Sequence, residues 1–138
     1  MAGLAAFGTT LSKGTGTPVA IANVTSIEGP GFSTEMLDVT AHDSGDGYRE
    51  RVPSFLDVGE ITLRLNWDPS DTSHVGTGSL HAAWVAKTAD TYTITFTDSS
   101  DTALSGSAYV SAISPSAPFD GKLEASVTLA PTGEWTFA

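Results

Sequence analysis

The sequence predicts a mainly β fold: an antiparallel β-sandwich or partly closed barrel with one flanking α-helix. Several segments alternate apolar and polar residues with a period of two, turn-rich segments separate them, and a single segment has helical spacing. The chain has 138 residues, 40% of them hydrophobic, which is enough for one core but too few for two. We therefore expect a single β domain over residues 19–138, preceded by a flexible arm over residues 1–18.

The first elements are predicted from short patterns. Residues 8–18 read "GTTLSKGTGTP", a Gly- and Thr-rich stretch without an apolar period, which is typical of a mobile arm. Residues 19–27 predict one strand, because alternate positions share a face. The residues on that face are Val19, Ile21, Asn23, Thr25 and Ile27. A second strand is expected over residues 33–41.

The strongest strand signal lies at residues 60–67, "EITLRLNW", where the apolar side chains alternate with polar ones. The predicted core residues of this strand are Ile61, Leu63, Leu65 and Trp67. Pro69 then ends the strand, and Ser70 or Asp71 is a candidate helix cap.

A helix is expected over residues 72–88, with Leu80 and Trp84 on its buried face and with Gly76 and Gly78 weakening its start. Alternation resumes after it, which predicts further strands. Their ranges are 91–97, 103–114 and 122–130, with a last short strand at "EWTF", residues 134–137.

Composition excludes several functional classes. The chain has 6 basic and 16 acidic residues, a net charge of −10, so its surface repels phosphate and does not favour ordinary nucleic-acid binding. It has no Cys, which excludes disulfides, zinc–thiolate sites and thiol nucleophiles. Its start lacks the features of a signal peptide, and no apolar run is long enough for a membrane span. We expect a soluble protein made in the cytoplasm, without a membrane partner.

Motifs for catalysis, metal binding or cofactor binding are missing from the sequence. A calcium loop counted from Asp43 lacks the required ligands after its first position. Asp68, Asp71 and His74 are spaced by three, but Asp71 is better interpreted as a helix cap and His74 as an exposed first-turn residue. His81 is expected to pack on Trp84, one helical turn away. We therefore predict no catalytic residue, no metal ligand and no cofactor.

The densest group of charged and aromatic residues is "AHDSGDGYRERVPSF", which begins at residue 41. We expect a long loop here, over residues 41–56, between two strands. Loops of such length are usually functional or disordered, and Tyr and Arg are enriched at protein interfaces. Two interpretations remain open from the residues alone: a solvated loop, or a contact surface in which Arg49 and Arg51 pair with acidic patches on another copy.

A longer stretch around this loop resembles a known family. Residues 27–71 contain, in order, an "I-x-G-P" turn, a strand ending in "D-V-T", an "H-x-S-x-D-G-Y-R-E" loop, and a "D-x-G-E" strand ending in "N-x-D-P-S-D". This order is similar to the major tail tube protein of lambda-type siphophages, bacteriophages with long non-contractile tails. The resemblance covers residues 19–134. Departures are the glycines near the helix start and the early end after "TGEW", with no appended immunoglobulin-like domain expected.

The resemblance implies a structural virion protein, made in the host bacterium. Members of the family form hexameric rings that stack into a tube, with sheets joining around the channel through which the genome leaves. Implied partners are other copies of the chain and the tape-measure, tail-tip and tail-terminator proteins, while DNA passes without tight binding. Residues carried over as contacts between rings are Asp46, Gly47, Tyr48, Arg49, Glu50 and Arg51 in the loop, and Gly14, Thr15, Gly16, Thr17 and Pro18 in the arm.

Two other functional classes remain as alternatives. An extracellular β-sandwich binding module, for a carbohydrate or protein ligand, needs an exposed aromatic platform. With Trp67 and Trp84 assigned to the core, Trp135 and Tyr48 remain for that role. A small hydrolase would need a catalytic motif, which the sequence lacks.

Overall fold

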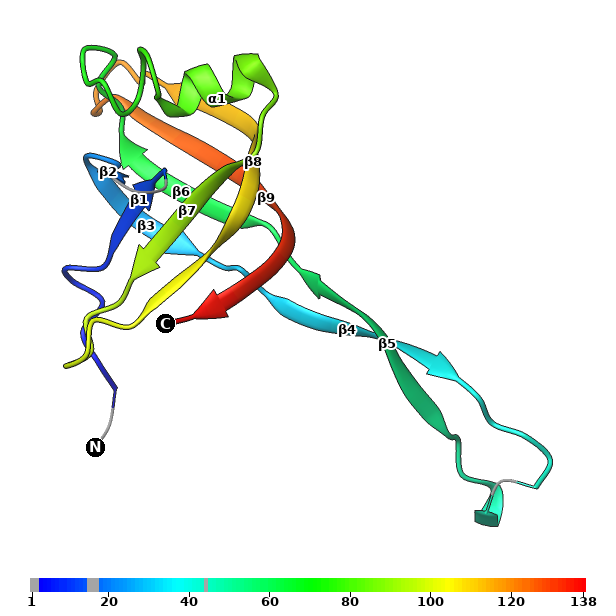
Figure 1. The fold of residues 1–138 in the computed structure, drawn as a ribbon. Coiled ribbons are helices and arrows are strands. Elements are labelled where there is room, and N and C mark those ends of the chain that lie inside the picture. Colours follow the sequence, from blue (N-terminus) through cyan, green and yellow to red (C-terminus); the bar gives the residue numbers. More distant parts are fainter. Residues whose placement is uncertain (1–2, 15–17, 44) are drawn as a thin grey trace.

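The computed structural model describes residues 3–14, 18–43 and 45–138. These residues form nine strands, one α-helix and one short 3-10 turn (Figure 1). The elements are β1 (Thr10–Lys13), β2 (Val19–Ala20), β3 (Val24–Glu28), β4 (Phe32–Asp38), η1 (Gly45–Gly47), β5 (Arg51–Val58), β6 (Ile61–Asn66), α1 (Leu80–Ala86), β7 (Asp90–Thr95), β8 (Ala103–Ser116) and β9 (Glu124–Phe137).

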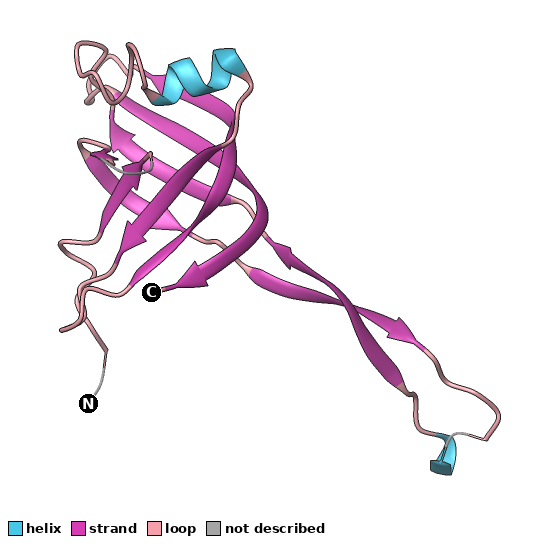
Figure 2. Cartoon of the chain, viewed as in Figure 1, coloured by secondary structure: helices cyan, strands magenta, loops and turns pink. Residues whose placement is uncertain are grey.

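Seven strands form one antiparallel sheet in the order β2-β1-β7-β8-β9-β6-β3. The sheet curls into a half-barrel with α1 across one end, while β4 and β5 form a separate two-stranded ribbon that projects away from the barrel (Figure 2). The predicted fold class, a mainly β antiparallel structure with one helix, is therefore confirmed. The partly closed barrel is the form it takes.

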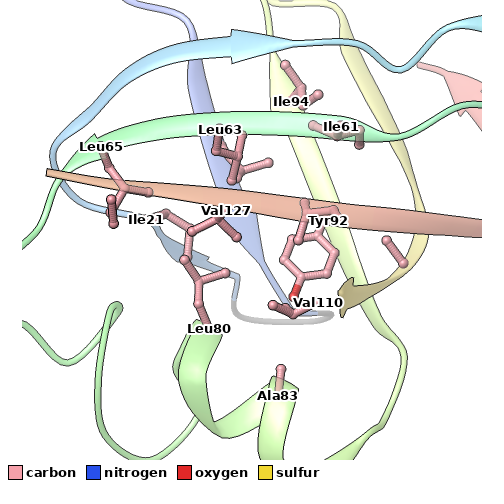
Figure 3. Close-up of a cluster of buried hydrophobic side chains, with 14 of the residues drawn as sticks. Ile21, Ile61, Leu63, Leu65, Leu80, Ala83, Tyr92, Ile94, Val110 and Val127 are labelled. Carbon is pink, nitrogen blue, oxygen red and sulfur yellow. The ribbon is translucent and has the colours of Figure 1, made fainter. Parts of the chain in front are cut away.

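The core fills the inside of the curled sheet (Figure 3). The alternation predicted for residues 60–67 holds along β6, where Ile61, Leu63 and Leu65 are buried and pair with residues of β9. Leu80 and Ala83 of α1 close one end of this core. Trp67 follows the end of β6 and packs against the core while remaining partly exposed. Burying these side chains is the main term that stabilises the half-barrel.

The prediction of a flexible arm over residues 1–18 is wrong for Thr10–Lys13, because these residues form strand β1. Leu11 is fully buried, and β1 pairs with β7, so this segment belongs to the sheet. The Lys13 ammonium lies 2.6 Å from an Asp90 carboxylate oxygen and donates a hydrogen bond to the Gly78 carbonyl. A four-residue strand has too short a pattern to detect among Gly and Thr.

The single strand expected over residues 19–27 is broken in two. Asn23 has a left-handed backbone with φ of 61°, which ends the extended chain between β2 and β3. As a result Ile21 is buried whereas Thr25 is exposed, so the two do not share a buried face. The hydroxyl of Thr25 instead donates to the Arg64 carbonyl on the neighbouring strand.

The helix is much shorter than the expected range of 72–88. Gly76 and Gly78 have φ of 130° and 77°, which no α-helix contains, so α1 begins only after Ser79. Ser79 is the N-cap, and its hydroxyl accepts a hydrogen bond from the Ala82 amide. Neither Ser70 nor Asp71 caps α1. Trp84 is 49% exposed, which corrects its assignment to the core.

The segment before α1 is held by two side chains that bind one backbone position, Ala22. The Ser73 hydroxyl accepts from the Ala22 amide, and His74 Nε2 donates to the Ala22 carbonyl at 2.6 Å. His74 Nδ1 accepts from the Asp68 amide, and its ring stacks on Trp67. His74 is therefore buried and not an exposed first-turn residue.

Asp71 supports this arrangement from the side. Its carboxylate accepts hydrogen bonds from the amide and the hydroxyl of Ser73, and these bonds lower the pKa of Asp71. The Asp71 side chain therefore orients Ser73 toward Ala22 and does not cap the helix. The expected packing of His81 on Trp84 is present, with ring centroids 6.0 Å apart.

Candidate assembly interface

The β4–β5 ribbon leaves the half-barrel through a base of three glycines, Gly29, Gly31 and Gly59. A β-carbon on Gly29 would lie 2.5 Å from the Glu60 carbonyl oxygen, and Gly29 has a positive φ of 90°. The Gly59 amide donates to the Gly31 carbonyl at 2.6 Å. These close backbone contacts join the ribbon to β3 and β6, so that it extends outward as in Figure 1.

Apolar side chains lie exposed on both faces of the ribbon. Directly paired residues of antiparallel strands share a face. Thr34 pairs with Leu56 on one face, and Leu37 pairs with Val52 on the other. The exposed large apolar residues of β4 and β5 are Phe32, Met36, Leu37, Val52, Phe55 and Leu56. An isolated two-stranded ribbon is marginally stable in water, so these faces need a partner.

The ribbon continues further than the sequence predicted. Residues 51–56, expected within the loop 41–56, belong to β5. Beyond β4, the Val39 amide donates to the Glu50 carbonyl, and the Glu50 amide donates to the Thr40 hydroxyl. Arg49 Nη1 donates to Asp38 Oδ2 at 2.8 Å. The hydrogen bonds from Thr40, with the Arg49 bond, lower the pKa of Asp38.

The outer end of the ribbon carries the predicted contact residues. Gly45–Gly47 form η1, with Asp46 in a left-handed conformation, and the Tyr48 amide donates to the Gly45 carbonyl. Tyr48 is 74% exposed, and Arg49 and Arg51 are also exposed. A Tyr and two Arg at the outer end of a projecting ribbon offer an amphipathic ring and guanidinium donors to another molecule.

The arm residues of the predicted contact set lie elsewhere. Gly14 follows β1, and its amide donates to the Thr91 carbonyl, while Pro18 directly precedes β2. Thr15, Gly16 and Thr17 lie outside the described residues. The structure therefore does not bring Gly14 and Pro18 close to the loop residues within one chain: β1 and β2 lie on the half-barrel, far from the outer end of the ribbon (Figure 1).

Sequence reasoning missed the apolar residues of the ribbon itself. The segments "FSTEMLDV" and "RVPSFLDV" carry apolar residues at both odd and even positions. Such a pattern within a strand bounded by turns indicates that both faces are covered. The single chain leaves both faces open, and this mismatch is the signal that points to an interface.

A second apolar surface lies at the end of the half-barrel that α1 does not cover. A groove of about 710 Å³ is bordered there by β3, the end of β7 and the N-terminal residues 4–9. The Thr97 hydroxyl donates to the Ala5 carbonyl at 2.6 Å, which holds the N-terminal segment beside the groove. Phe7 is 96% exposed at its rim.

The groove connects to the base of the ribbon through aromatic contacts. The ring centroids of Phe96 and Phe137 are 6.4 Å apart, and those of Phe137 and Phe32 are 6.1 Å apart. Phe96 lines the groove, and Phe32 begins β4. One end of the molecule therefore presents a continuous apolar strip.

The described part of the chain lacks the features of other functional classes. Within residues 3–14, 18–43 and 45–138, no group of three His, Asp or Glu side chains is placed to hold a metal ion. Trp135, which the binding-module alternative left free for an aromatic platform, is buried. In the same ranges, no helix has the length and apolar character needed to cross a membrane.

Comparison with known structures shows the same fold in tubular assemblies. The tail of an empty gene transfer agent particle, with C6 symmetry, is 18% identical, with coverages of 94% of this chain and 95% of that chain, and has a TM-score of 0.75. The sheath–tube complex of the extracellular contractile injection system PVC is 16% identical, with coverages of 99% and 91% and a TM-score of 0.70.

The SPP1 tail tube is 13% identical, with coverages of 94% and 75% and a TM-score of 0.67. At such low sequence identities, the structural likeness shows only that this chain has the same fold. A search of curated protein sequences found no match.

The family is shown by sequence. A model of the family described as phage tail tube protein matches residues 10–137, which include every strand and the helix described above. The match agrees with the resemblance carried by the motifs of residues 27–71. The chain belongs to the phage tail tube protein family.

Proposed function

We propose that this chain forms hexameric rings that stack into the tail tube, with the β4–β5 ribbon as the contact between rings. The observation that carries the proposal is the ribbon itself, which projects from the half-barrel with apolar residues exposed on both faces. A segment of this kind is costly to leave in water, and a neighbouring copy covers it in a polymer.

Family membership makes the chain a structural component of a phage tail, located in the virion. The six-fold arrangement is supported by the gene transfer agent tail, which has the same fold and C6 symmetry. The role proposed is structural and not catalytic.

The sheet edges suggest how the ring closes. The sheet ends in β2 on one side and β3 on the other, and neither edge has a further strand from the described residues. An open edge is a template for pairing with another chain. In the proposed ring, sheets of successive copies join at these edges and line the central channel.

The charge of the chain suits a conduit for DNA. With a net charge of −10, six copies around a channel would repel phosphate, so that a genome passes without tight binding. At its ends the tube would meet tape-measure, tail-tip and tail-terminator proteins. The fold likeness to the PVC sheath/tube terminator and to the cap of the anti-feeding prophage supports such end partners.

The test is a double substitution at the outer end of the ribbon, Tyr48→Ala with Arg49→Ala. Because interface anchors of these types are worth about 2 kcal/mol or more each, the variant should form few or no tubes in electron micrographs. Exposed side chains contribute little to the subunit alone, so its thermal unfolding should change by less than about 0.5 kcal/mol.

Lys122→Ala is the matched control. It removes the exposed ion pair between Lys122, in the β8–β9 connection, and Glu124, the first residue of β9. This pair is comparable in exposure to the Asp38–Arg49 pair but lies outside the ribbon. This control should form tubes like those of the unaltered chain. Tubes of normal length from the double variant would refute the role of the ribbon.

A further inference from the structure

We propose that Phe119, at the tip of the connection between β8 and β9, inserts into the apolar groove of a second copy in the next ring. The inference rests on the proposed function, because it presupposes stacked rings. It names a contact between rings that is separate from the ribbon. The chain carries both halves of this contact, an aromatic tip and an apolar groove, at opposite ends of the half-barrel.

The aromatic tip is the single residue Phe119. Its side chain is fully exposed, more so than any other large hydrophobic residue in the described part of the chain. A phenylalanine side chain buries about 150–250 Å² when it is covered, which is a large gain for one residue. Single exposed apolar residues are common on protein surfaces, so the way in which Phe119 is presented decides whether it is an anchor.

The connection holds Phe119 at the corner of a tight turn. The Gly121 amide donates to the Pro118 carbonyl at 3.4 Å, and a β-carbon on Gly121 would lie 2.8 Å from Pro118 Cγ. Gly is favoured at the fourth position of such a turn. The base of the connection is fixed as well, because the Trp67 amide donates to the Leu123 carbonyl. A tip that is ordered before binding loses little conformational entropy when it docks.

The tip and the groove lie at opposite ends of the half-barrel. Leu123 is bonded to Trp67, whose ring stacks on His74 in the segment before α1, so the connection belongs to the α1 end (Figure 1). The groove lies at the other end, beside the N-terminal residues 4–9. Phe119 therefore cannot reach the groove of its own chain.

This placement suits copies that stack in the same orientation. In the proposed tube, the α1 end of one subunit faces the groove end of a subunit in the next ring. A contact between two different surfaces of identical subunits is head-to-tail, and it repeats from copy to copy. The tip and the groove can therefore meet at every step of the tube.

The groove has the chemistry to receive an aromatic ring. Val24, Ile27 and Phe96 line it while packing against the core, and they remain only partly buried. No charged side chain lines it, and its volume is about 710 Å³. Phe7 is exposed at its rim and offers a second ring against which an inserted Phe119 can pack.

The charges near the two surfaces do not attract each other. Glu28 and Asp98 follow the groove residues Ile27 and Thr97 in the chain, and Asp120 follows Phe119. The nearby Lys122 ammonium is already paired with Glu124, at 3.5 Å. Salt at about 0.15 M screens exposed charges beyond about 8 Å. The contact therefore depends on burial of the Phe119 ring and not on ion pairs.

Photo-crosslinking in assembled tubes tests the contact directly. A photoreactive benzoyl derivative of phenylalanine replaces Phe119, the protein is mixed with an excess of unaltered chain, and tubes are grown and irradiated. Mass spectrometry of the digested dimer then identifies the linked peptide. We expect links to the groove segments, residues 4–9, 24–29 or 94–97. The matched control carries the same derivative at Phe55, which is also highly exposed, and should give no link to these segments.

The outcomes separate this inference from the proposed function. Tubes in which position 119 links only to other segments, or to none, would overturn the groove contact and leave the tube itself established. Links from position 55 to the groove segments, with none from position 119, would also overturn it. Unaltered protein that forms no tubes, even on a tail-tip seed, would defeat both proposals.

Substitution of the tip gives a second measurement. Phe119→Ala should raise the protein concentration at which half of the chain sediments as tubes by about ten-fold or more, because a buried aromatic anchor is lost. Phe119→Leu keeps an apolar group and should raise it less. Both variants should unfold like the unaltered subunit, since Phe119 is exposed there. An unchanged concentration for Phe119→Ala would contradict the proposal.

Discussion

The indole ring of Trp135 occupies the space that a side chain at Gly106 would need. A β-carbon on Gly106 would lie 2.5 Å from the nearest ring atoms, and Trp135 Nε1 donates a hydrogen bond to the Ser107 carbonyl at 3.0 Å. The pairing of β8 with β9 is irregular at this point, between Ser105 and Ser107. This contact holds the end of β9 against β8, and from there Phe137 reaches Phe32 and Phe96.

Gly106→Ala should therefore destabilise the subunit. The added methyl group forces Trp135 to move, and overpacking of this kind costs about 1–3 kcal/mol. The measurement is the free energy of unfolding from denaturant titration. Gly45→Ala is the control, because a β-carbon there meets nothing within 4 Å. An unaltered unfolding free energy for Gly106→Ala would show that Trp135 can shift without loss.

His74→Phe should also destabilise the fold, by about 2–4 kcal/mol, because it leaves two backbone groups without a partner. Phenylalanine retains a ring beside Trp67, but it can neither accept from the Asp68 amide nor donate to the Ala22 carbonyl. Thermal unfolding of the variant measures the effect. His42→Phe, at an exposed position, should leave the melting temperature nearly unchanged. Equal melting of both variants would argue against this role of His74.

The folded subunit should lose stability in acid, because several of its carboxylates become protonated. Hydrogen bonds to four aspartate carboxylates lower their pKa values below the usual 3.8. These residues are Asp38, Asp68, Asp71 and Asp98, and Asp98 accepts its hydrogen bonds from Thr102. A carboxyl group with a lowered native pKa stabilises the fold above its unfolded pKa, and this contribution is lost as the pH falls through the native value. The wild type should therefore lose stability as the pH drops below about 4.

Asp98→Asn tests one of these groups. The variant lacks the titrating carboxylate, so its unfolding free energy should depend less steeply on pH in this acid range than that of the wild type. Thr102→Val, which removes the hydroxyl donor but keeps the Asp98 carboxylate, should give an intermediate slope. The measurement is a series of urea titrations at different pH values. If the unfolding free energy of Asp98→Asn depended on pH as steeply as that of the wild type, the assignment would be contradicted.

The sequence alone determined those features that depend on neighbouring residues. Alternation from Ile61 to Leu65 predicted a half-buried strand, because side chains of a strand point to opposite faces whatever it pairs with. The ordered motifs of residues 27–71 predicted the family. The fold class followed from many such local patterns, and the outer end of the ribbon was recognised as a loop with interface residue types.

The tertiary structure decided which apolar residues are covered, since the covering element lies far along the chain. Trp135 is buried because Gly106 leaves room for it, whereas Trp84 is half-exposed because no described element covers that side of α1. Thr10–Lys13 is a strand because β7 supplies its partner. The ribbon is the opposite case, in which no distant element covers the apolar residues. β4 and β5 pair only with each other, so their apolar faces remain open. Only the three-dimensional arrangement reveals this surface for another copy.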